Sequence, residues 1–198
     1  MKAVKEVVRK YYKYVPWTQP VMSSNIQNGI TLSATNFNSN NLYILMNGVS
    51  NSDYICPTST SSYGSTFIIN LDYYIRLNRF SFNYYRKTNV NYGLTSFKVV
   101  AVVDGNEVDI TPSDNTPEGW NTLTSQVNNL NTNCIKISCS TGGSPYVRIG
   151  EITLQGDIVE EATQQDYDFY KDTYEYSIPK ETVRNYYKYV DFYKAVKI

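Results

Sequence analysis

An eleven-residue block near the start of the chain returns near its end, and this repeat limits how the chain can be organised. Residues 5–15 (KEVVRKYYKYV) and 180–190 (KETVRNYYKYV) agree at nine of eleven positions, at a constant offset of 175. A repeat that brackets one region is typical of modules that join into arrays. Because only a short stub follows the second copy, we expect the two blocks to be matching end-pieces around a single module.

Charge and composition divide the chain into three predicted regions. Residues 1–16 carry five basic residues and one acid. Their apolar residues follow the spacing of one helix face, although Val and Tyr favour strands, and we predict a short helix over 1–15 that Pro16 ends. Residues 157–175 hold seven acids and one lysine, which predicts an extended or weakly helical linker. We therefore expect an N-terminal docking segment (1–16), a folded module (17–156), and an acidic linker with a C-terminal docking segment (157–198).

The middle region has the pattern of short strands separated by turns rich in Asn, Gly, Ser and Pro. The sequence Asp104-Gly105-Asn106 is a hairpin signal between two of them. Several antiparallel strands at regular spacing predict an all-β fold, an antiparallel two-sheet β-sandwich with short N- and C-terminal extensions. The predicted strands are 29–35, 42–46, 65–71, 74–85, 96–103, 107–110, 121–127, 133–140 and 147–154.

The composition argues against several classes of function. The chain has no histidine, which removes the commonest general base and most zinc sites. Its formal net charge is zero, so it has no general attraction for nucleic acid or membranes, and no stretch is long enough to span a bilayer. The spacing of the acids shows no pair facing each other across a cleft, as a glycosidase needs. We expect a protein that is not an enzyme and that binds neither nucleic acid nor membrane.

Three short motifs in the middle region resemble those of discoidin-like modules. They are 17–20 (WTQP), 47–54 (NGVSNSDY) and 146–152 (YVRIGEI), in the order and spacing of that family. The family, also called F5/8 type C, has a galactose-binding-like β-sandwich, or jelly-roll, fold, and the resemblance covers residues 17–156. The sequence YYKY before WTQP is similar to the lead-in of tandem modules in phage appendage and bacterial surface proteins.

The resemblance implies a structural calcium ion. Many members hold calcium with an Asp in the loop that corresponds to motif 47–54 and a Glu in the last strand, which corresponds to motif 146–152. Here the two positions are Asn47 and Glu151, and Asn51 in the same loop is a third candidate ligand. An amide oxygen can bind calcium, but it lacks the charge of a carboxylate. The alternative is that Asn47 only forms a turn and Glu151 is a partly buried, hydrogen-bonded acid.

The resemblance also implies glycan binding by loops at one end of the sandwich, through an aromatic platform and a few polar groups. The chain has twenty tyrosines, so packing or chance explains each loop tyrosine better than a binding role does. As a group they favour a site for a bacterial surface glycan. The candidates are Tyr54, Tyr63, Arg86, Tyr92 and Tyr146, with the amides of residues 38–41 as donors.

The repeated end blocks predict contacts with other subunits. Tyr and Arg are common at protein interfaces because they combine a large contact area with hydrogen-bonding groups. Alternating basic and aromatic residues also suit single-stranded nucleic acid, but the chain is neutral, which favours assembly. The basic block is expected to attract the acidic linker of a neighbouring subunit as well. The predicted assembly residues are Arg9, Tyr11, Tyr12, Tyr14, Arg184, Tyr186, Tyr187 and Tyr189.

Together these observations predict a non-enzymatic phage virion protein. It would be a fibre, tail or capsid-decorating subunit that forms homo-oligomers, contacts other virion proteins and binds host glycans for attachment. The lack of an apolar N-terminal signal segment favours a location in the virion. The alternative is a carbohydrate-binding module of a bacterial surface protein, located at the cell surface or outside the cell. A glycan-depolymerising enzyme is the least favoured interpretation.

Overall fold

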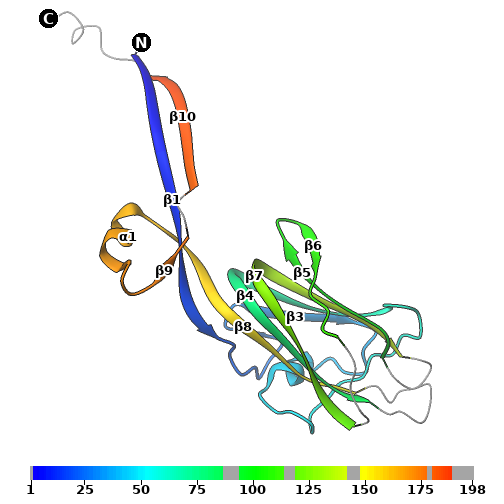
Figure 1. Ribbon diagram of the computed structural model, residues 1–198. Coiled ribbons are helices and arrows are strands. Elements are labelled where there is room, and N and C mark those ends of the chain that lie inside the picture. Colours follow the sequence, from blue (N-terminus) through cyan, green and yellow to red (C-terminus); the bar gives the residue numbers. More distant parts are fainter. Residues whose placement is uncertain (1, 87–93, 114–118, 142–147, 178–179, 189–198) are drawn as a thin grey trace, which may run out of the picture. The chain divides into compact units, whose positions relative to one another are not determined.

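A computed structural model describes residues 2–86, 94–113, 119–141, 148–177 and 180–188 (Figure 1). Side chains are described for residues 10–85, 97–113, 119–140 and 148–177. The chain divides into two compact units, which we call the sandwich unit and the end unit. The sandwich unit contains residues 16–159, and the end unit combines residues 1–15 with 160–198. The sequence predicts two separate docking segments, whereas the structure joins both ends of the chain in one unit.

The described part of the sandwich unit consists of antiparallel strands and a short 3-10 helix. Consecutive strands along the chain are not always neighbours: β4 pairs with β3, β7 and β8, and β7 pairs with β4 and β5. The strand β8 continues beyond this unit, to Ala162. The elements are β2 (Ile26–Gln27), β3 (Ile30–Thr35), η1 (Leu42–Met46), β4 (Ser65–Arg86), β5 (Leu94–Val103), β6 (Asn106–Asp109), β7 (Gly119–Thr141) and β8 (Arg148–Ala162).

Two long strands, β4 and β7, take part in both layers of the sandwich. The first part of β4, up to Asn70, pairs with β7 near Cys134–Cys139, whereas its second part pairs with the beginning of β7 and with β8. The register shifts between Asn70 and Ile75 and again between Leu77 and Arg79. Such irregularities bend a strand and allow it to pass from one sheet to another. The predicted all-β, antiparallel β-sandwich is thus confirmed.

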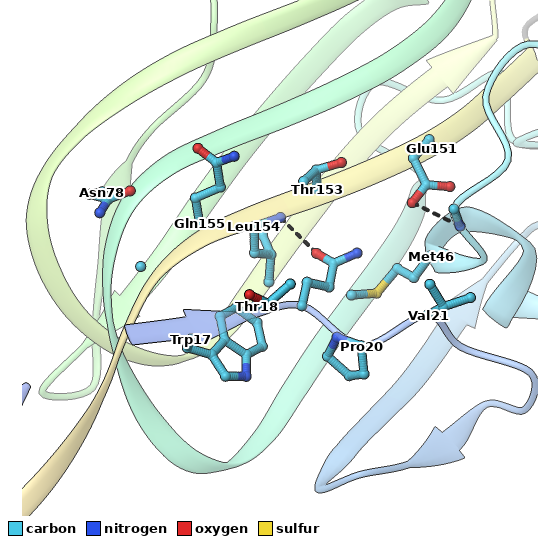
Figure 2. A pocket seen from close by; sticks show the side chains of 13 residues that line it. Trp17, Thr18, Pro20, Val21, Met46, Asn78, Glu151, Thr153, Leu154 and Gln155 are labelled. Atoms are coloured by element: carbon cyan, nitrogen blue, oxygen red, sulfur yellow. Dashed lines mark hydrogen bonds between the residues drawn. The ribbon is translucent and has the colours of Figure 1, made fainter. Parts of the chain in front are cut away.

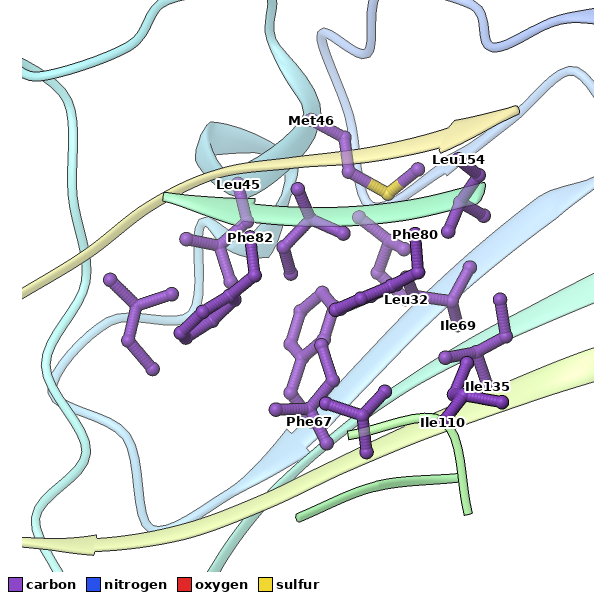
Figure 3. Packing of buried hydrophobic residues seen from close by; sticks show 14 of the residues in the cluster. Leu32, Leu45, Met46, Phe67, Ile69, Phe80, Phe82, Ile110, Ile135 and Leu154 are labelled. Carbon is purple, nitrogen blue, oxygen red and sulfur yellow. The ribbon is translucent and has the colours of Figure 1, made fainter. Parts of the chain in front are cut away.

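The core lies between the two parts of β4, because alternate side chains of both parts point inward. Phe67 and Ile69 from the first part join Phe80, Phe82 and Tyr84 from the second in one buried cluster (Figure 3). The Phe82 ring stacks on the rings of Phe80, Tyr84 and Phe97, with centroids 6.5, 5.9 and 4.7 Å away. Ser81, Asn83 and Tyr85 alternate with these residues and therefore lie on the opposite face of β4, outside this core cluster.

Two details of the sandwich unit test the predicted elements. Asp104 and Gly105 have φ angles of +49° and +80°, as a two-residue hairpin turn between β5 and β6 requires, so the predicted hairpin is confirmed. The predicted strand 42–46 is wrong, because this segment is the 3-10 helix η1. Leu42, Leu45 and Met46 are its buried residues, and this three- and four-residue spacing puts them on one side of a helix.

The end unit is built on a long strand where we predicted a helix. Residues 2–15 belong to β1 (Lys2–Thr18), which pairs antiparallel with β10 (Lys180–Lys188) and with β9 (Glu175–Tyr176). The predicted helix over 1–15 is therefore wrong. The preference of Val and Tyr for strands outweighs the helical spacing, because the second copy of the block provides a strand partner.

The acidic segment folds onto the basic segment of the same chain. It ends β8 at Ala162 and then forms the helix α1 (Gln164–Tyr170), which begins with a capping box between Thr163 and Asp166. Lys13 forms an ion pair with Glu160 at 2.7 Å, and Lys10 pairs with Glu161. We predicted that the basic block attracts the acidic linker of a neighbouring subunit, whereas these ion pairs form between the two segments of the same chain. No helix of the described residues is long and apolar enough to cross a membrane.

A pair of isoleucine substitutions tests the position of the core. Ile69 is fully buried, whereas Ile26 in the same unit is 73% exposed. We expect Ile69→Ala to lower the free energy of unfolding by about 2–5 kcal/mol, because it leaves a cavity. Ile26→Ala should change it by less than about 0.5 kcal/mol. Urea denaturation of both variants measures this difference, and equal effects would contradict the described packing.

Candidate functional site

Loops from both sheets meet at one end of the sandwich unit. Ile55 exchanges two backbone hydrogen bonds with Ile149 of β8, at 2.9 and 2.8 Å. Four residues later, the Ser59 N–H donates to the Ser65 hydroxyl, at the start of β4. Residues 55–59 therefore connect the beginning of β8 to the beginning of β4. This is the loop end of the sandwich, and the predicted loop residue Tyr54 lies beside it.

Four side chains gather at this loop end in what we call the aromatic–arginine cluster: Tyr54, Tyr85, Trp120 and Arg148. The strand register places Tyr85 between Trp120 on β7 and Arg148 on β8. The Trp120 ring lies 5.6 Å from the Tyr85 ring, edge to face, and 6.3 Å from the Tyr54 ring. Tyr54 is 38% exposed. The cluster thus combines an exposed ring from a loop with two half-buried rings from the strands β4 and β7.

The Arg148 guanidinium lies against two of these rings. Its central carbon is 4.7 Å from the Tyr54 ring centroid and 5.5 Å from that of Tyr85. Cation–π contacts of this kind hold the planar group in a fixed orientation. Within the described residues, no acceptor is hydrogen-bonded to its N–H groups. Its donors are therefore available to oxygen atoms of a ligand.

The buried side chain of Asn83 on β4 connects the strands of the cluster to a neighbouring loop. Its side chain is only 4% exposed, and its Nδ2 donates to Asn51 Oδ1 at 3.1 Å and to the Asn121 carbonyl at 3.2 Å. A Cβ atom at Gly150 would stand 2.5 Å from Asn83 Oδ1 and 3.1 Å from the Trp120 ring. Glycine at 150 therefore lets Asn83 and Trp120 approach β8 closely. The buried amide fixes the loop at Asn51 relative to the strands.

The structure places the predicted calcium ligands in two different environments. Asn47 Oδ1 accepts the Val49 N–H at 2.9 Å, and the neighbouring Gly48 N–H donates to Glu151 Oε1 at 3.3 Å. Asn47 and Glu151 therefore meet at one loop. Asn51 turns instead to Asn83. Among the described residues, no group of three or more Cys, Asp or Glu side chains could hold a metal ion, and calcium stays a prediction.

Among the described acids of the sandwich unit, Glu151 has the largest shift in pKa. Burial raises its pKa from the ordinary value of 4.5 to about 7, although hydrogen bonds from the Gly48 and Val49 N–H groups act in the opposite direction. Its second oxygen, Oε2, is buried and has no hydrogen-bond partner in the part of the chain that the structure describes. A buried carboxylate oxygen without a donor is costly unless it binds a proton or a cation. The residues present fit a bound cation in this respect only.

A groove of about 450 Å³ runs beside Glu151 along β8 (Figure 2). The Gln19 side chain forms one wall and pairs with the β8 backbone: Nε2 donates to the Ile152 carbonyl at 2.9 Å, and Oε1 accepts the Leu154 N–H at 2.7 Å. The amide thus imitates a neighbouring strand. This bond pair gives the motif 17–20 a structural role, that of holding the segment against β8.

The remaining predicted residues are placed as follows. Tyr63 lies two residues before β4, is exposed, and takes no part in the ring contacts found among the described residues. Arg86 ends β4, and its side chain, Tyr92, Tyr146 and Tyr189 lie outside the described residues. Tyr11 is buried in the end unit, where its ring stacks on Tyr167 at 4.9 Å and its hydroxyl donates to Gln164. Tyr12 and Tyr14 are half-buried, and the strand register alone places Arg9, Arg184, Tyr186 and Tyr187.

Sequence reasoning missed three of the four cluster residues and their support, Asn83. One signal was present in the alternation of β4. Phe80, Phe82 and Tyr84 point into the core, so Asn83 and Tyr85 had to lie on the other face. Nothing in the sequence indicated that Trp120 and Arg148 would stand beside Tyr85, because this depends on the pairing of strands far apart in the chain.

Comparisons with known proteins find similarity to this chain only in solved structures, at the level of the fold. No protein-family model matches the chain, and no curated protein matches it. Among solved structures, a family 32 carbohydrate-binding module of NanJ from Clostridium perfringens, in complex with galactose, is 16% identical, with a TM-score of 0.49. The match covers 75% of this chain and 99% of that module. These modules are of the discoidin-like, galactose-binding-like kind that the sequence motifs resemble.

Two further matches come from the same organism. A family 32 module of a family 31 glycoside hydrolase is 15% identical over 65% of this chain and 91% of that chain, with a TM-score of 0.45. A family 89 glycoside hydrolase, in complex with 2-acetamido-1,2-dideoxynojirmycin, is 21% identical over 66% of this chain, with a TM-score of 0.48. This chain spans only 14% of that enzyme. We transfer no residue role from these structures.

The raised pKa of Glu151 predicts an unusual pH dependence of stability. The folded state binds the proton more tightly than the unfolded state, whose Glu151 pKa is near 4.5. The stabilisation is therefore complete below about pH 4.5 and is lost as the pH rises through about 7. We expect the melting temperature of the sandwich unit to fall between pH 5 and pH 8, in chelator, by more in the wild type than in Glu151→Gln.

Glu107→Gln is the matched control for this measurement. Glu107 lies exposed on the β6 hairpin, where the hydrogen bond from Lys136 lowers its pKa. It therefore titrates below the tested range, and its replacement should leave the slope between pH 5 and pH 8 unchanged. Identical slopes for the wild type and Glu151→Gln would contradict the described environment of Glu151.

Proposed function

We propose that the sandwich unit is a non-catalytic glycan-binding module. The observation that carries this proposal is the aromatic–arginine cluster at the loop end. Trp120 packs against Tyr54 and Tyr85, and Arg148 lies against the same two rings with N–H groups that no described residue accepts. Small-ligand sites combine apolar and aromatic surface with a few fixed polar groups. This combination suits a sugar ring, which has apolar C–H faces and a rim of hydroxyls.

The cluster would divide recognition between its two kinds of side chain. The exposed Tyr54 ring offers a surface for the C–H face of a pyranose, while the Arg148 N–H groups donate to its hydroxyl or ring oxygens. Because the cation–π contacts and the buried Asn83 amide already fix the site, little side-chain freedom is lost on binding. A neutral sugar needs no strong charge, which agrees with the zero net charge of the chain.

We favour a module of a bacterial surface protein over the phage virion subunit that the sequence predicts. The cluster supports sugar binding, a property that either a bacterial surface protein or a virion subunit could use. The virion role rests on the repeated end blocks and on the similarity of their lead-in sequence alone, and no contact in the structure adds to it. Location at the cell surface, outside the cell, follows from this proposal. Virion partners stay a prediction.

We also propose a structural cation, with calcium as the candidate, at the loop of Asn47 and Glu151. The supporting observation is the buried, unpartnered Oε2 of Glu151. The ion would keep the carboxylate charged at neutral pH and would hold the 47–54 loop near β8. The conformation of the loops at this end of the sandwich would then depend on the bound ion.

Calcium binding is tested by thermal unfolding at pH 8, with chelator or with millimolar calcium, the concentration range of extracellular modules. Calcium should raise the melting temperature of the wild type and of Glu107→Gln, because it binds only the folded state. It should leave Glu151→Gln unchanged. A wild type that does not respond would overturn the cation proposal and would leave glycan binding to its own test.

Glycan binding is tested with an array of bacterial and host glycans, followed by calorimetry on the best ligand. Galactose and GalNAc-β-1,3-galactose are suitable first probes, since two of the similar modules are found in complex with these sugars. We expect Tyr54→Ala and Arg148→Ala to weaken binding by about tenfold or more, the equivalent of about 1.4 kcal/mol. Tyr74→Ala is the control, because Tyr74 is 48% exposed on β4, beside Val159 and far along the strand from Tyr85. An array without binding would overturn the proposal.

A further inference from the structure

The groove along β8 is lined by polar side chains that the fold does not use. They are Thr153 and Gln155 on β8, Asn78 on β4, and Thr18. None of these four side chains is hydrogen-bonded to another described residue. Gln19 in the same groove differs, because its amide is bonded to the β8 backbone. The groove therefore offers two amides and two hydroxyls, which are donors and acceptors, to a ligand.

A bulge in β4 places Asn78 in the wall of the groove. The β4 residues on either side of it stand opposite Gly156 and Gln155, which are consecutive in β8, so Asn78 is an extra residue without a β8 partner. Bulges redirect side chains and are common beside functional sites. Glycine at 156 permits this close approach, since a Cβ atom there would stand 2.3 Å from the Arg76 carbonyl oxygen.

The Trp17 indole gives the groove an aromatic surface. The ring is half-buried, packs against the core cluster, and meets the Tyr73 ring edge to face with centroids 6.2 Å apart. Pro20, Met46 and Leu154 add apolar lining (Figure 2). These contacts hold the indole in place before a ligand arrives, so little side-chain freedom is lost on binding.

We propose that this groove is a second glycan-binding site. The Trp17 ring takes the C–H face of a pyranose, and the unbonded amides and hydroxyls pair with the hydroxyls of the sugar. The volume of about 450 Å³ suits a small ligand. Among the described residues that line the groove, none is Lys or Arg, and Glu151 already accepts a backbone N–H. The charge therefore favours a neutral ligand over a phosphate or another anion.

A sugar fits this groove better than a peptide strand does. A strand that joined β8 here would need the backbone groups of Ile152 and Leu154. The Gln19 amide already occupies both of them, at 2.9 and 2.7 Å. A ligand must therefore bind through side chains, and the side chains present suit hydroxyl groups.

The groove is separate from the aromatic–arginine cluster. Arg148 of the cluster and Gln155 of the groove are seven residues apart on β8, which is about 23 Å along an extended strand. One sugar unit cannot contact both. The groove shares its ligand class with the proposal for the loop end but uses none of the cluster residues, so either site can fail alone. Two sites in one module would raise its avidity for a glycan surface.

The two tryptophans of the chain allow each site to be observed by itself, because Trp17 lines the groove and Trp120 belongs to the cluster. Their indole N–H signals in NMR spectra of the full chain are assigned with Trp17→Phe and Trp120→Phe. The probes are galactose, glucose, mannose and their N-acetylated forms at millimolar concentration. We expect at least one sugar to shift the Trp17 signal in a saturable manner. A Trp17 signal that none of them moves would overturn this proposal, whereas an unmoved Trp120 signal would count against the loop end alone.

A double variant distinguishes binding in the groove from an indirect effect of binding elsewhere. Asn78→Ala/Gln155→Ala removes both unbonded amides, and we expect the affinity reported by the groove tryptophan to fall about tenfold or more, with the response of the other tryptophan unchanged. Asn131→Ala/Gln126→Ala is the matched control, since these two residues are exposed on β7 and do not line the groove. It should bind as the wild type does. Equal affinities for the groove variant and the wild type would refute the site.

Discussion

The bend of the paired strands β4 and β7 determines where everything else in the sandwich unit lies. Both strands are too long to bury their apolar face in one flat sheet, and the register shifts after Asn70 and Leu77 turn them so that this face closes on itself. Phe67 and Ile69 then meet Phe80 and Phe82 across one core. Removal of apolar surface from water drives this closure. The other strands add to the edges that the bend creates.

Closure of the core has a direct effect on the opposite face of β4. Because Phe82 and Tyr84 are committed inward, Asn83 and Tyr85 are held outward by the same backbone, with no freedom to turn. The strand pairing then brings Trp120 and Arg148 to either side of Tyr85. The candidate site is thus an outer layer of the sheet, fixed by the packing beneath it, and it needs little rearrangement to receive a ligand.

Local patterns in the sequence were sufficient for the fold class but not for the site. The predicted strand 74–85 and the Asp104-Gly105 turn report backbone preferences, and the structure agrees with both. The block 1–15 misled the prediction, since its helical spacing competes with the strand preference of Val and Tyr, and the partner that decides the outcome lies 175 residues away. The same limit applies to Trp120 and Arg148, whose neighbours are set by long-range pairing. The burial of Glu151 and the lack of a hydrogen-bond donor for its Oε2 among the described residues depend on the conformation of the surrounding loop. A short sequence motif does not specify that conformation.

The antiparallel register of β1 and β10 also determines how this chain can be carried. Lys2 stands opposite Lys188, so the incoming and outgoing strands lie about 5 Å apart, the spacing of neighbouring strands. A folded segment whose two ends are this close can occupy a surface loop of another protein without separating the residues that flank that loop. The geometry that pairs the two end blocks therefore makes residues 2–188 an insertable segment, equally suited to the middle of a long polypeptide and to one of its ends.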